Sequence, residues 1–488
     1  MYDFTGEDKI RCELITAILH SCELNGLNSI PLVNAGIVPP LLLFLQKGSL
    51  EIIQVTVKLL AELSSVEQNK VLIAKAGAIP VLMKFLMGHH SLDQIKVDIT
   101  YILSNLASDT HNAHEIDSEA AVVRLFTMMK SKDTGLQDSL KTLQFMAKDS
   151  QTVRKHVVEM GMVPIFYALL RGKVSTVCHQ SILNILCHIS RSCEDSRPII
   201  PSADDVKYLI SLLGSNASME EKESAVIILE VLLNAEETRS TILSDDKLLT
   251  LCVEYLQQGT AKMKESVGVL LSNFAHFGLE DATILLAFSR TNVISACKAV
   301  IDDASSSEKT RKHAAKILCH LSFHTPRLTL KRPPLLTYLD ITGLKKFKVC
   351  RVHGGNCGNR NNTFCLIEAD VIPSLVNLVR QGVLPSAEWA VKALYTLVEN
   401  SENIRKGVDF LMQSDLLAPL IALIGKDHSS TEASILILEK VFRFKKYRDS
   451  KYGLVAKTAL TQTVSALDNC DLRTLASTTL MHFNTETS

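Results

Sequence analysis

A five-residue phrase that returns at a fixed spacing constrains this chain more than any other feature of its sequence. It reads Ala-Gly-Ile-Val-Pro at 35–39, Ala-Gly-Ala-Ile-Pro at 76–80 and Met-Gly-Met-Val-Pro at 160–164, with a weaker copy, Ala-Asp-Val-Ile-Pro, at 369–373. The second copy follows the first by 41 residues, and the third follows the second by 84, which is two periods. Such a period is typical of stacked helical units, because one unit cannot bury its own apolar face.

The residues within each period predict helices. Gly tolerates the left-handed turn that follows a helix, and Pro is preorganised for the first turn of the next one. In the second period we expect a short apolar helix over 81–86 and a longer amphipathic helix over 93–108. In the longer helix, Ile95, Ile99 and Leu103 belong to one apolar stripe with three- and four-residue steps.

Length, composition and charge agree with stacked repeats. At 488 residues the chain is too long for one ordinary globular core, whereas a solenoid grows by adding layers. Hydrophobic residues make up 47% of the chain and aromatic residues only 5%, so the interior must be built from aliphatic side chains. Basic and acidic residues number 52 each, so net charge gives no reason to expect a nucleic-acid partner.

The cysteines and the apolar runs indicate in which compartment of the cell the protein is expected. Several of the twelve cysteines lie inside apolar runs, as Cys187 does, which favours reduced thiols in a cytosolic or nuclear protein. Met1 is not followed by a basic and apolar segment typical of a secretory signal. No run approaches the roughly 20 apolar residues needed to cross a bilayer. We expect a soluble cytoplasmic protein without a transmembrane segment; a nuclear location and peripheral contact with the plasma membrane stay open.

The repeat phase breaks once. Asn292 and Asp370 hold equivalent positions but are 78 residues apart, which is one unit plus about 36 residues. We therefore predict a truncated N-terminal repeat at 1–32, repeats over 33–323, an insertion at 324–366 and further repeats over 367–488.

The sequences expected to form the long helix of each unit identify the type of repeat. Ile-Leu-Ser-Asn-Leu-Ala at 102–107 and Leu-Leu-Ser-Asn-Phe-Ala at 270–275, together with the Gly-x-[Ile/Val]-Pro junctions, resemble armadillo repeats. HEAT repeats have a similar period, but the junction favours armadillo. The resemblance implies an all-α fold, a right-handed armadillo superhelical solenoid of about ten repeats with one insertion.

The same resemblance suggests a binding groove. In armadillo proteins such as importin-α and β-catenin, the long third helices line a concave groove, where Asn side chains hold the backbone of an extended peptide. An amide suits this role because it donates and accepts hydrogen bonds at once. Only Asn105 and Asn273 keep Asn at the aligned positions, and the chain has one Trp, so an import receptor is not expected. The candidate groove residues are Glu62, Asn105, His188, Asn273, His320 and Trp389. Alternatively, Asn105 and Asn273 serve only neighbouring carbonyl groups.

Three cysteines and one histidine fall within 16 residues at the end of the insertion. Cys350, His353, Cys357 and Cys365 are of the types that bind zinc tetrahedrally, although their spacing is not that of a standard zinc finger. The alternative is a reduced loop rich in Gly and Asn. Zinc is the one cofactor considered; no phosphate-binding loop, dinucleotide fingerprint or nucleophile motif is present, so no catalytic residue is predicted.

A basic cluster follows later in the chain. It comprises Lys440, Arg443, Lys445, Lys446 and Arg448. Such a run is typical of a solvated helix end. The alternative is contact with anionic lipid or with an acidic partner segment.

A narrower resemblance covers roughly 350–484. Cys-Arg-Val-His-Gly-Gly-Asn-Cys at 350–357, Thr-Phe-Cys-Leu-Ile-Glu at 363–368 and Leu-Glu-Lys-Val-Phe-Arg at 438–443 resemble the C-terminal armadillo region of plant U-box ubiquitin ligases. In that family the U-box precedes the repeats and recruits the E2 enzyme; here residue 1 already lies in a repeat, so we expect no U-box in this chain.

The U-box resemblance implies a non-enzymatic partner-binding region whose partners are other proteins, either ubiquitination substrates or signalling partners. Two alternatives stay open. The chain could be part of a full E3 ligase whose catalytic module is missing here, or a stand-alone armadillo scaffold or adaptor.

Overall fold

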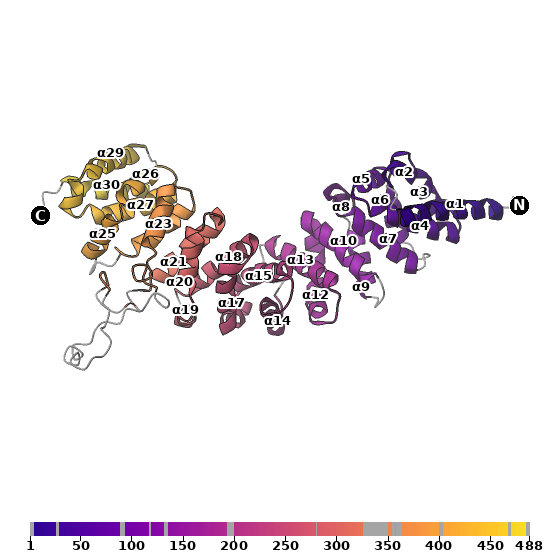
Figure 1. Ribbon diagram of the computed structural model, residues 1–488, viewed down its shortest axis with the longest axis horizontal. Helices are drawn as coiled ribbons and strands as arrows, with labels where there is room; N and C mark the ends of the chain where they lie inside the picture. The colour runs from indigo at the N-terminus through magenta and orange to yellow at the C-terminus, as the bar shows by residue number, and fades with distance from the viewer. Residues whose placement is uncertain are drawn as a thin grey trace. The chain divides into compact units, whose positions relative to one another are not determined.

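The computed structural model describes residues 4–25, 29–87, 93–116, 119–130, 135–192, 200–279, 281–325, 350–353, 357, 364–399, 404–466 and 470–484. Helices and turns account for the regular structure in these ranges, and no strand occurs among them (Figure 1). The chain forms two compact units, Met1–Thr238 and Arg239–Ser488. The predicted all-α solenoid is confirmed. Most of the predicted insertion, at 326–349, 354–356 and 358–363, lies outside the described residues.

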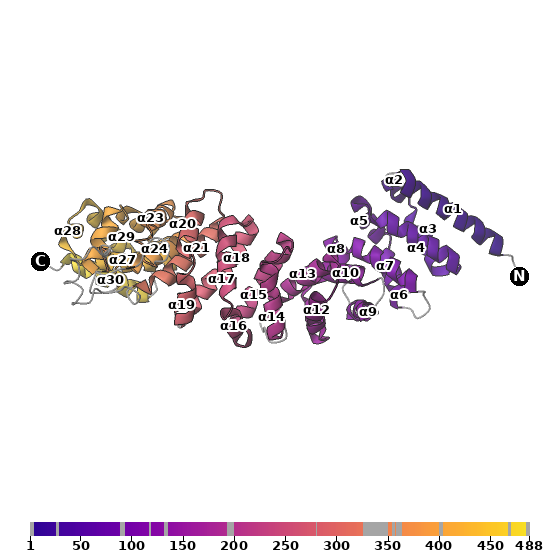
Figure 2. The same cartoon turned by 60° about the horizontal axis from the view of Figure 1, so that its bottom comes forward.

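In the first unit, one helix of each repeat stacks on its counterpart in the next. We call these the third helices: α1 (Phe4–Asn25), α4 (Leu50–Ser64), α7 (Asp93–Leu106), α10 (Leu136–Asp149), α13 (Thr176–Ser192) and α15 (Met219–Asn234). Each contacts the next in that order (Figures 1 and 2). The shorter helices are α2 (Ile30–Asn34), α3 (Val38–Lys47), α5 (Glu67–Lys75), α6 (Ala78–Met87), α8 (Thr110–Ile116), α9 (Glu119–Lys130), α11 (Gln151–Glu159), α12 (Met162–Arg171) and α14 (Ala203–Leu213), and α16 (Glu236–Leu243) crosses the unit boundary.

The second unit repeats this plan. Its third helices are α18 (Ala261–Phe277), α21 (Glu308–Ser322), α24 (Ser386–Tyr395), α27 (His428–Val441) and α30 (Cys470–Asn484), and each contacts the next. A second row stacks in parallel: α17 (Asp246–Gln258), α20 (Val293–Asp302), α23 (Ile372–Gln381), α26 (Leu417–Leu423) and α29 (Lys451–Ala466). The remaining short helices are α19 (Ala282–Ser289), α25 (Ile404–Gln413) and α28 (Lys445–Arg448).

Burial between neighbouring layers stabilises each third helix. In α4, which lies between α1 and α7, Leu59, Leu60 and Leu63 are completely buried. Burying one such side chain contributes about 1.5–3 kcal/mol. No repeat could bury these residues alone, so the layers stabilise one another.

The repeated phrase marks the turns between helices. Gly36, Gly77 and Gly161 have φ of 86°, 83° and 65°, and Asp370, at the same place in the weaker copy, has φ of 56°. These angles lie in the left-handed region that Gly adopts without steric cost. The following Pro lies in the first turn of the next helix, so α6 begins at Ala78, three residues before the predicted position.

Hydrogen bonds between layers repeat at the same interval. The Asn69 side-chain amide donates to the Ser29 hydroxyl at 2.7 Å, 40 residues away, and the Asn105 amide donates to the Ser64 hydroxyl at 3.0 Å, 41 residues away. Buried polar groups therefore fix the register of neighbouring repeats.

The residues described directly before α23 differ from those that begin the neighbouring repeats. α19 and α25 begin their repeats, but residues 364–371, which precede α23, form a single turn. In this turn the Ala369 amide donates to the Cys365 carbonyl at 3.0 Å.

No single described helix is long and apolar enough to span a bilayer; α19 and α20 reach that length and composition only as a bent pair. The Phe288 and Val293 side chains of this pair are buried within the protein.

Replacing Gly77 with Ala should destabilise the turn between α5 and α6 by about 1–2 kcal/mol, because a side chain at φ 83° is strained although nothing lies within 4 Å of the new Cβ. Hydrogen-exchange protection of the α5 and α6 amides measures this loss. Gly77→Asn is the matched control and should lose less, since Asn tolerates left-handed backbone. Equal losses for the two variants would contradict the backbone explanation.

Candidate functional site

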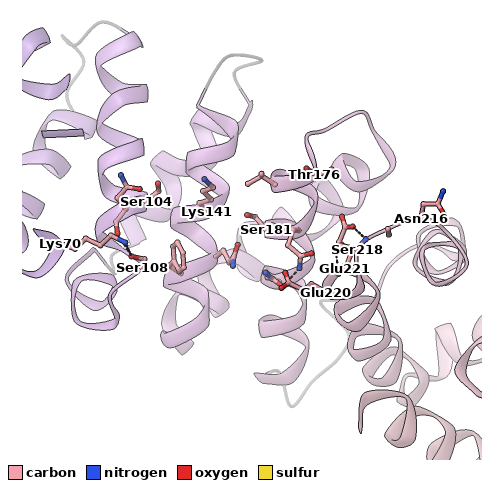
Figure 3. A pocket seen from close by; sticks show the side chains of 17 residues that line it. Lys70, Ser104, Ser108, Lys141, Thr176, Ser181, Asn216, Ser218, Glu220 and Glu221 are labelled. Carbon is pink, nitrogen blue, oxygen red and sulfur yellow. Dashed lines mark hydrogen bonds between the residues drawn. The ribbon is translucent and has the colours of Figure 1, made fainter. Parts of the chain in front are cut away.

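A polar groove of about 880 Å³ runs across successive third helices of the first unit (Figure 3). α7, α10 and α13 supply its walls, and the residues around the N-terminus of α15 form one end. Its polar lining consists of Lys70, Ser104, Asn105, Ser108, Lys141, Gln144, Thr176, Gln180, Ser181, Asn184, Asn216, Ser218, Glu220 and Glu221.

Four side-chain amides follow one another along this groove: Asn105 on α7, Gln144 on α10, and Gln180 and Asn184 on α13. The Gln180 amide donates to the Asn184 side-chain oxygen at 3.0 Å, and the hydroxyl of Ser224 donates to the same oxygen at 3.2 Å. The Asn184 NH₂ group and the Gln180 oxygen have no partner among the described residues. The amides therefore retain both donors and acceptors for a bound chain.

The two ends of the groove differ in charge. At one end the ammonium group of Lys70 contacts Glu67 and donates to the Ser108 hydroxyl at 2.7 Å. At the other end lie Glu220, which is exposed, and Glu221, whose carboxylate contacts His179 Nδ1 at 2.6 Å. The charge difference thus favours one orientation of an extended ligand in the groove over the reverse orientation.

Only one of the predicted groove residues in this unit lines the groove. Asn105 does so, although its NH₂ group also bonds Ser64 in the preceding layer. Glu62 and His188 are half-buried on α4 and α13 and lie outside the lining. Alignment on the leucines selects one position per helix and therefore missed Gln180 and Asn184. Gln180 lies two helical turns before His188, and Asn184 lies one turn before it. This four-residue spacing of polar side chains was the feature of the sequence that could have identified them.

A smaller pocket of about 320 Å³ lies in the second unit and is lined by His320, Tyr395 and Leu436, among others. Of the predicted groove residues, His320 lines this pocket, and Trp389 contacts His320 without lining it. The rings of His320 and Trp389 are 5.6 Å apart, and the Lys392 ammonium lies 4.8 Å from the Trp389 ring centre. Asn273 is half-buried on α18 and does not line this pocket.

His320 is a neutral imidazole at physiological pH. Burial, with a smaller contribution from Lys316 and His276, lowers its pKa to about 4. Its Nε2 atom is buried and has no hydrogen-bond partner among the described residues.

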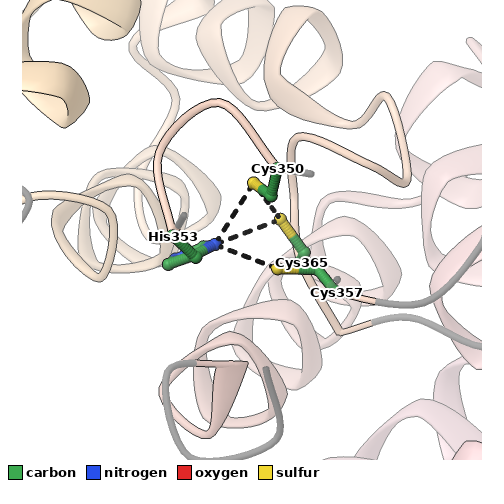
Figure 4. Close-up of side chains that lie close together, drawn as sticks. All are labelled: Cys350, His353, Cys357 and Cys365. Carbon is green, nitrogen blue, oxygen red and sulfur yellow. Dashed lines mark hydrogen bonds between the residues drawn. The ribbon is translucent and has the colours of Figure 1, made fainter. Parts of the chain in front are cut away.

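The four predicted metal ligands converge in the second unit (Figure 4). Their ligand atoms all lie within 4.8 Å of one another. Hydrogen bonds with the Cys357 and Cys365 thiols lower the pKa of Cys350, whereas hydrogen bonds with Cys350 and Cys357 raise the pKa of Cys365. The arrangement therefore favours at least one thiolate, the form that binds metals.

The predicted basic cluster is divided by its surroundings. Lys440 and Arg443 both pair with Glu439, at 2.9 and 2.6 Å. Arg448 is buried and donates to the Phe442 carbonyl at 3.1 Å. Lys445 and Lys446 are exposed. Anionic contact through this cluster stays a prediction.

Sequence comparison relates the chain to plant proteins. It is 22% identical over 475 residues to U-box domain-containing protein 44 of Arabidopsis thaliana, a match that covers 90% of the chain and 59% of the relative. It is also 35% identical over 135 residues to U-box domain-containing protein 24 of Oryza sativa subsp. japonica, covering 26% of the chain and 16% of the relative. This chain resembles plant U-box proteins. No family model matches it.

A third relative is the putative U-box domain-containing protein 42 of Arabidopsis thaliana, 26% identical over 152 residues, which are 28% of the chain and 14% of the relative. The chain thus spans 59% of the length of protein 44, and these matches to proteins 42 and 24 cover far less of either relative.

Solved structures support the fold. An engineered protein superposes with a TM-score of 0.66 at 17% identity, covering 92% of this chain and 99% of that one. A structure from a study of a phosphorylation switch in the interaction between cadherin and beta-catenin superposes with a TM-score of 0.59 at 12% identity, covering 92% and 94%. Both agree with the all-α solenoid.

Acidification should destabilise the second unit partly through His320. Because its folded pKa of about 4 lies below the ordinary value of 6.5, the unfolded state binds the proton first, and stability falls as pH drops from 6.5 towards 4. His320→Gln should reduce the pH slope of the urea-unfolding free energy by up to about 1 kcal/mol per pH unit. Gln257→Ala, which changes an exposed side chain in the same unit, is the control and should keep the wild-type slope. An unchanged slope in His320→Gln would contradict the assignment.

Proposed function

We propose that this chain is the partner-binding region of a U-box type ubiquitin ligase, and that the groove of its first unit binds an extended segment of a partner protein. The observation that carries the proposal is the row of amides across three successive third helices. The U-box relatives support the connection with ubiquitination.

An extended segment suits this groove physically. Its backbone presents an N–H donor and a C=O acceptor at every residue, and the groove amides offer the complementary groups. Packed helices lie roughly 8–10 Å apart and an extended chain rises about 3.3 Å per residue, so each layer holds about three residues. A groove from α7 to α15 therefore accommodates on the order of ten residues.

Charge adds selectivity to this backbone recognition. Lys70 favours an acidic residue at one end of the segment and Lys141 favours one nearer its middle, whereas Glu220 favours a basic residue at the other end. Charge complementarity of this kind fixes the direction of binding and raises the association rate more than the affinity.

The names of the relatives favour a second candidate, a complete E3 ligase of which this chain is one part. In that case the repeats select the substrate and a U-box elsewhere in the protein recruits the E2 enzyme. A scaffold or adaptor unrelated to ubiquitin is the third candidate.

The double variant Gln180→Ala/Asn184→Ala should weaken peptide binding by about tenfold or more, since each lost hydrogen bond contributes about 0.5–1.5 kcal/mol. Unstructured 12-residue peptides selected on the wild-type chain from a display library provide the probes, and fluorescence anisotropy measures their affinity. Gln257→Ala removes an exposed amide outside the groove and is the matched control. Peptides that bind the double variant as tightly as wild type would refute the groove assignment.

A ubiquitination assay tests whether the isolated chain is itself a ligase. With E1, E2 and ubiquitin, the chain alone should form no polyubiquitin, because its helical layers offer no E2-binding platform of the U-box kind. Immunoblotting for ubiquitin chains reads the result, with an active U-box ligase as the positive control. Polyubiquitin formation by this chain would establish it as a ligase in its own right.

A further inference from the structure

The cluster at the end of the insertion has the dimensions of a metal site. His353 Nδ1 lies 3.5 Å from the Cys350 sulfur, 3.4 Å from the Cys357 sulfur and 3.5 Å from the Cys365 sulfur. The sulfurs of Cys350 and Cys365 are 3.8 Å apart. That separation is far beyond a disulfide bond, which is about 2.05 Å long.

These distances match a tetrahedron around one zinc ion. Zinc bonds sulfur at about 2.3 Å and imidazole nitrogen at about 2.0–2.1 Å. In tetrahedral geometry, those bonds place two sulfurs about 3.8 Å apart and a sulfur and a nitrogen about 3.5 Å apart. We propose that Cys350, His353, Cys357 and Cys365 bind one Zn²⁺ ion.

The donor set and its burial specify a structural site. Three thiolates and one imidazole are soft donors that suit Zn²⁺, whereas Ca²⁺ and Mg²⁺ prefer oxygen. Four protein ligands complete the tetrahedron and leave no position for water, as in structural rather than catalytic zinc sites. Cys350 and Cys365 are buried, and His353 is 8% exposed, so the ion would be enclosed by protein.

The position of the cluster explains what the ion stabilises. The ligands lie on both sides of residues 358–363 in the sequence and before α23, where the described residues 364–371 form a single turn. Val352 packs with Cys350 and Cys365, and Phe410 of α25 packs against them. α25 is the first helix of the next repeat. The zinc-bound turn therefore provides part of the surface on which α25 packs.

The wild-type chain tests the site without any substitution. After expression in zinc-supplemented medium, mass spectrometry of the metals should give one zinc per chain. X-ray absorption should find three sulfur atoms at about 2.3 Å and one nitrogen at about 2.0–2.1 Å around it. A chain without zinc, a shell rich in oxygen, or a disulfide between Cys350 and Cys365 would overturn the proposal.

Variants locate the ion. Cys357→Ser should lose the bound zinc, because Cys357 is the least buried of the three sulfur ligands and its replacement removes one ligand. Cys12→Ser, which alters a half-buried thiol in α1, is the matched control and should keep one zinc per chain. Zinc retained at the wild-type ratio by Cys357→Ser would place the ion elsewhere.

Hydrogen exchange tests the structural role. Removing zinc from the wild-type chain with a chelator should accelerate exchange in residues 364–371 and in α25, and leave α7, α10 and α13 unchanged. If exchange in α25 does not respond, the ion does not stabilise the repeat and that part of the proposal is wrong.

Discussion

The structure depends on mutual burial between layers. A third helix such as α18 contacts the neighbouring helix α21 in the same row, and its Leu270, Leu271 and Phe274 side chains are buried. Because burial of this kind is shared between repeats, the stability of one layer includes the contribution of the next. This packing leaves one face of each third helix uncovered by the neighbouring layers. In the first unit that face carries Gln180 and Asn184, so the same packing that builds the stack also sets the polar residues of successive helices in one groove.

The sequence predicted the stack well because its signals are local. Gly77 must adopt φ of 83° whichever helices surround it, and the following Pro favours a helix start in any context. The groove was harder to predict because the exposed side of a helix depends on its neighbours. Alignment selected His188, yet packing turns Gln180 and Asn184 into the groove. Likewise, the sequence left open whether Asn105 faces a partner or serves neighbouring groups, and the structure shows that it lines the groove and also bonds Ser64 across the layers.

The thiol cluster shows a different limit. The sequence shows the types and number of the ligands. It does not show that the four side chains converge on one point, because their spacing follows no standard zinc finger. This convergence depends on the turn at 364–371, where the Val371 amide donates to the Leu366 carbonyl at 3.1 Å and so leads into α23. It also depends on Phe410, which is 45 residues beyond Cys365 in the sequence. Contacts that distant leave no periodic signal.

A solenoid has little tolerance for an incomplete layer, because each layer shelters the apolar face of its neighbour. Before α23 the described residues 364–371 form a turn, and without a fixed turn α25 would lose part of its support. Four metal bonds can hold a short turn in place where a short helix would need a larger apolar face, since zinc binding in small sites supplies folding free energy directly. The metal ligands therefore compensate for the insertion, because they hold together the chain segments on either side of 358–363. The stack continues from Asp370, whose carboxylate pairs with Lys298 of α20 at 3.0 Å.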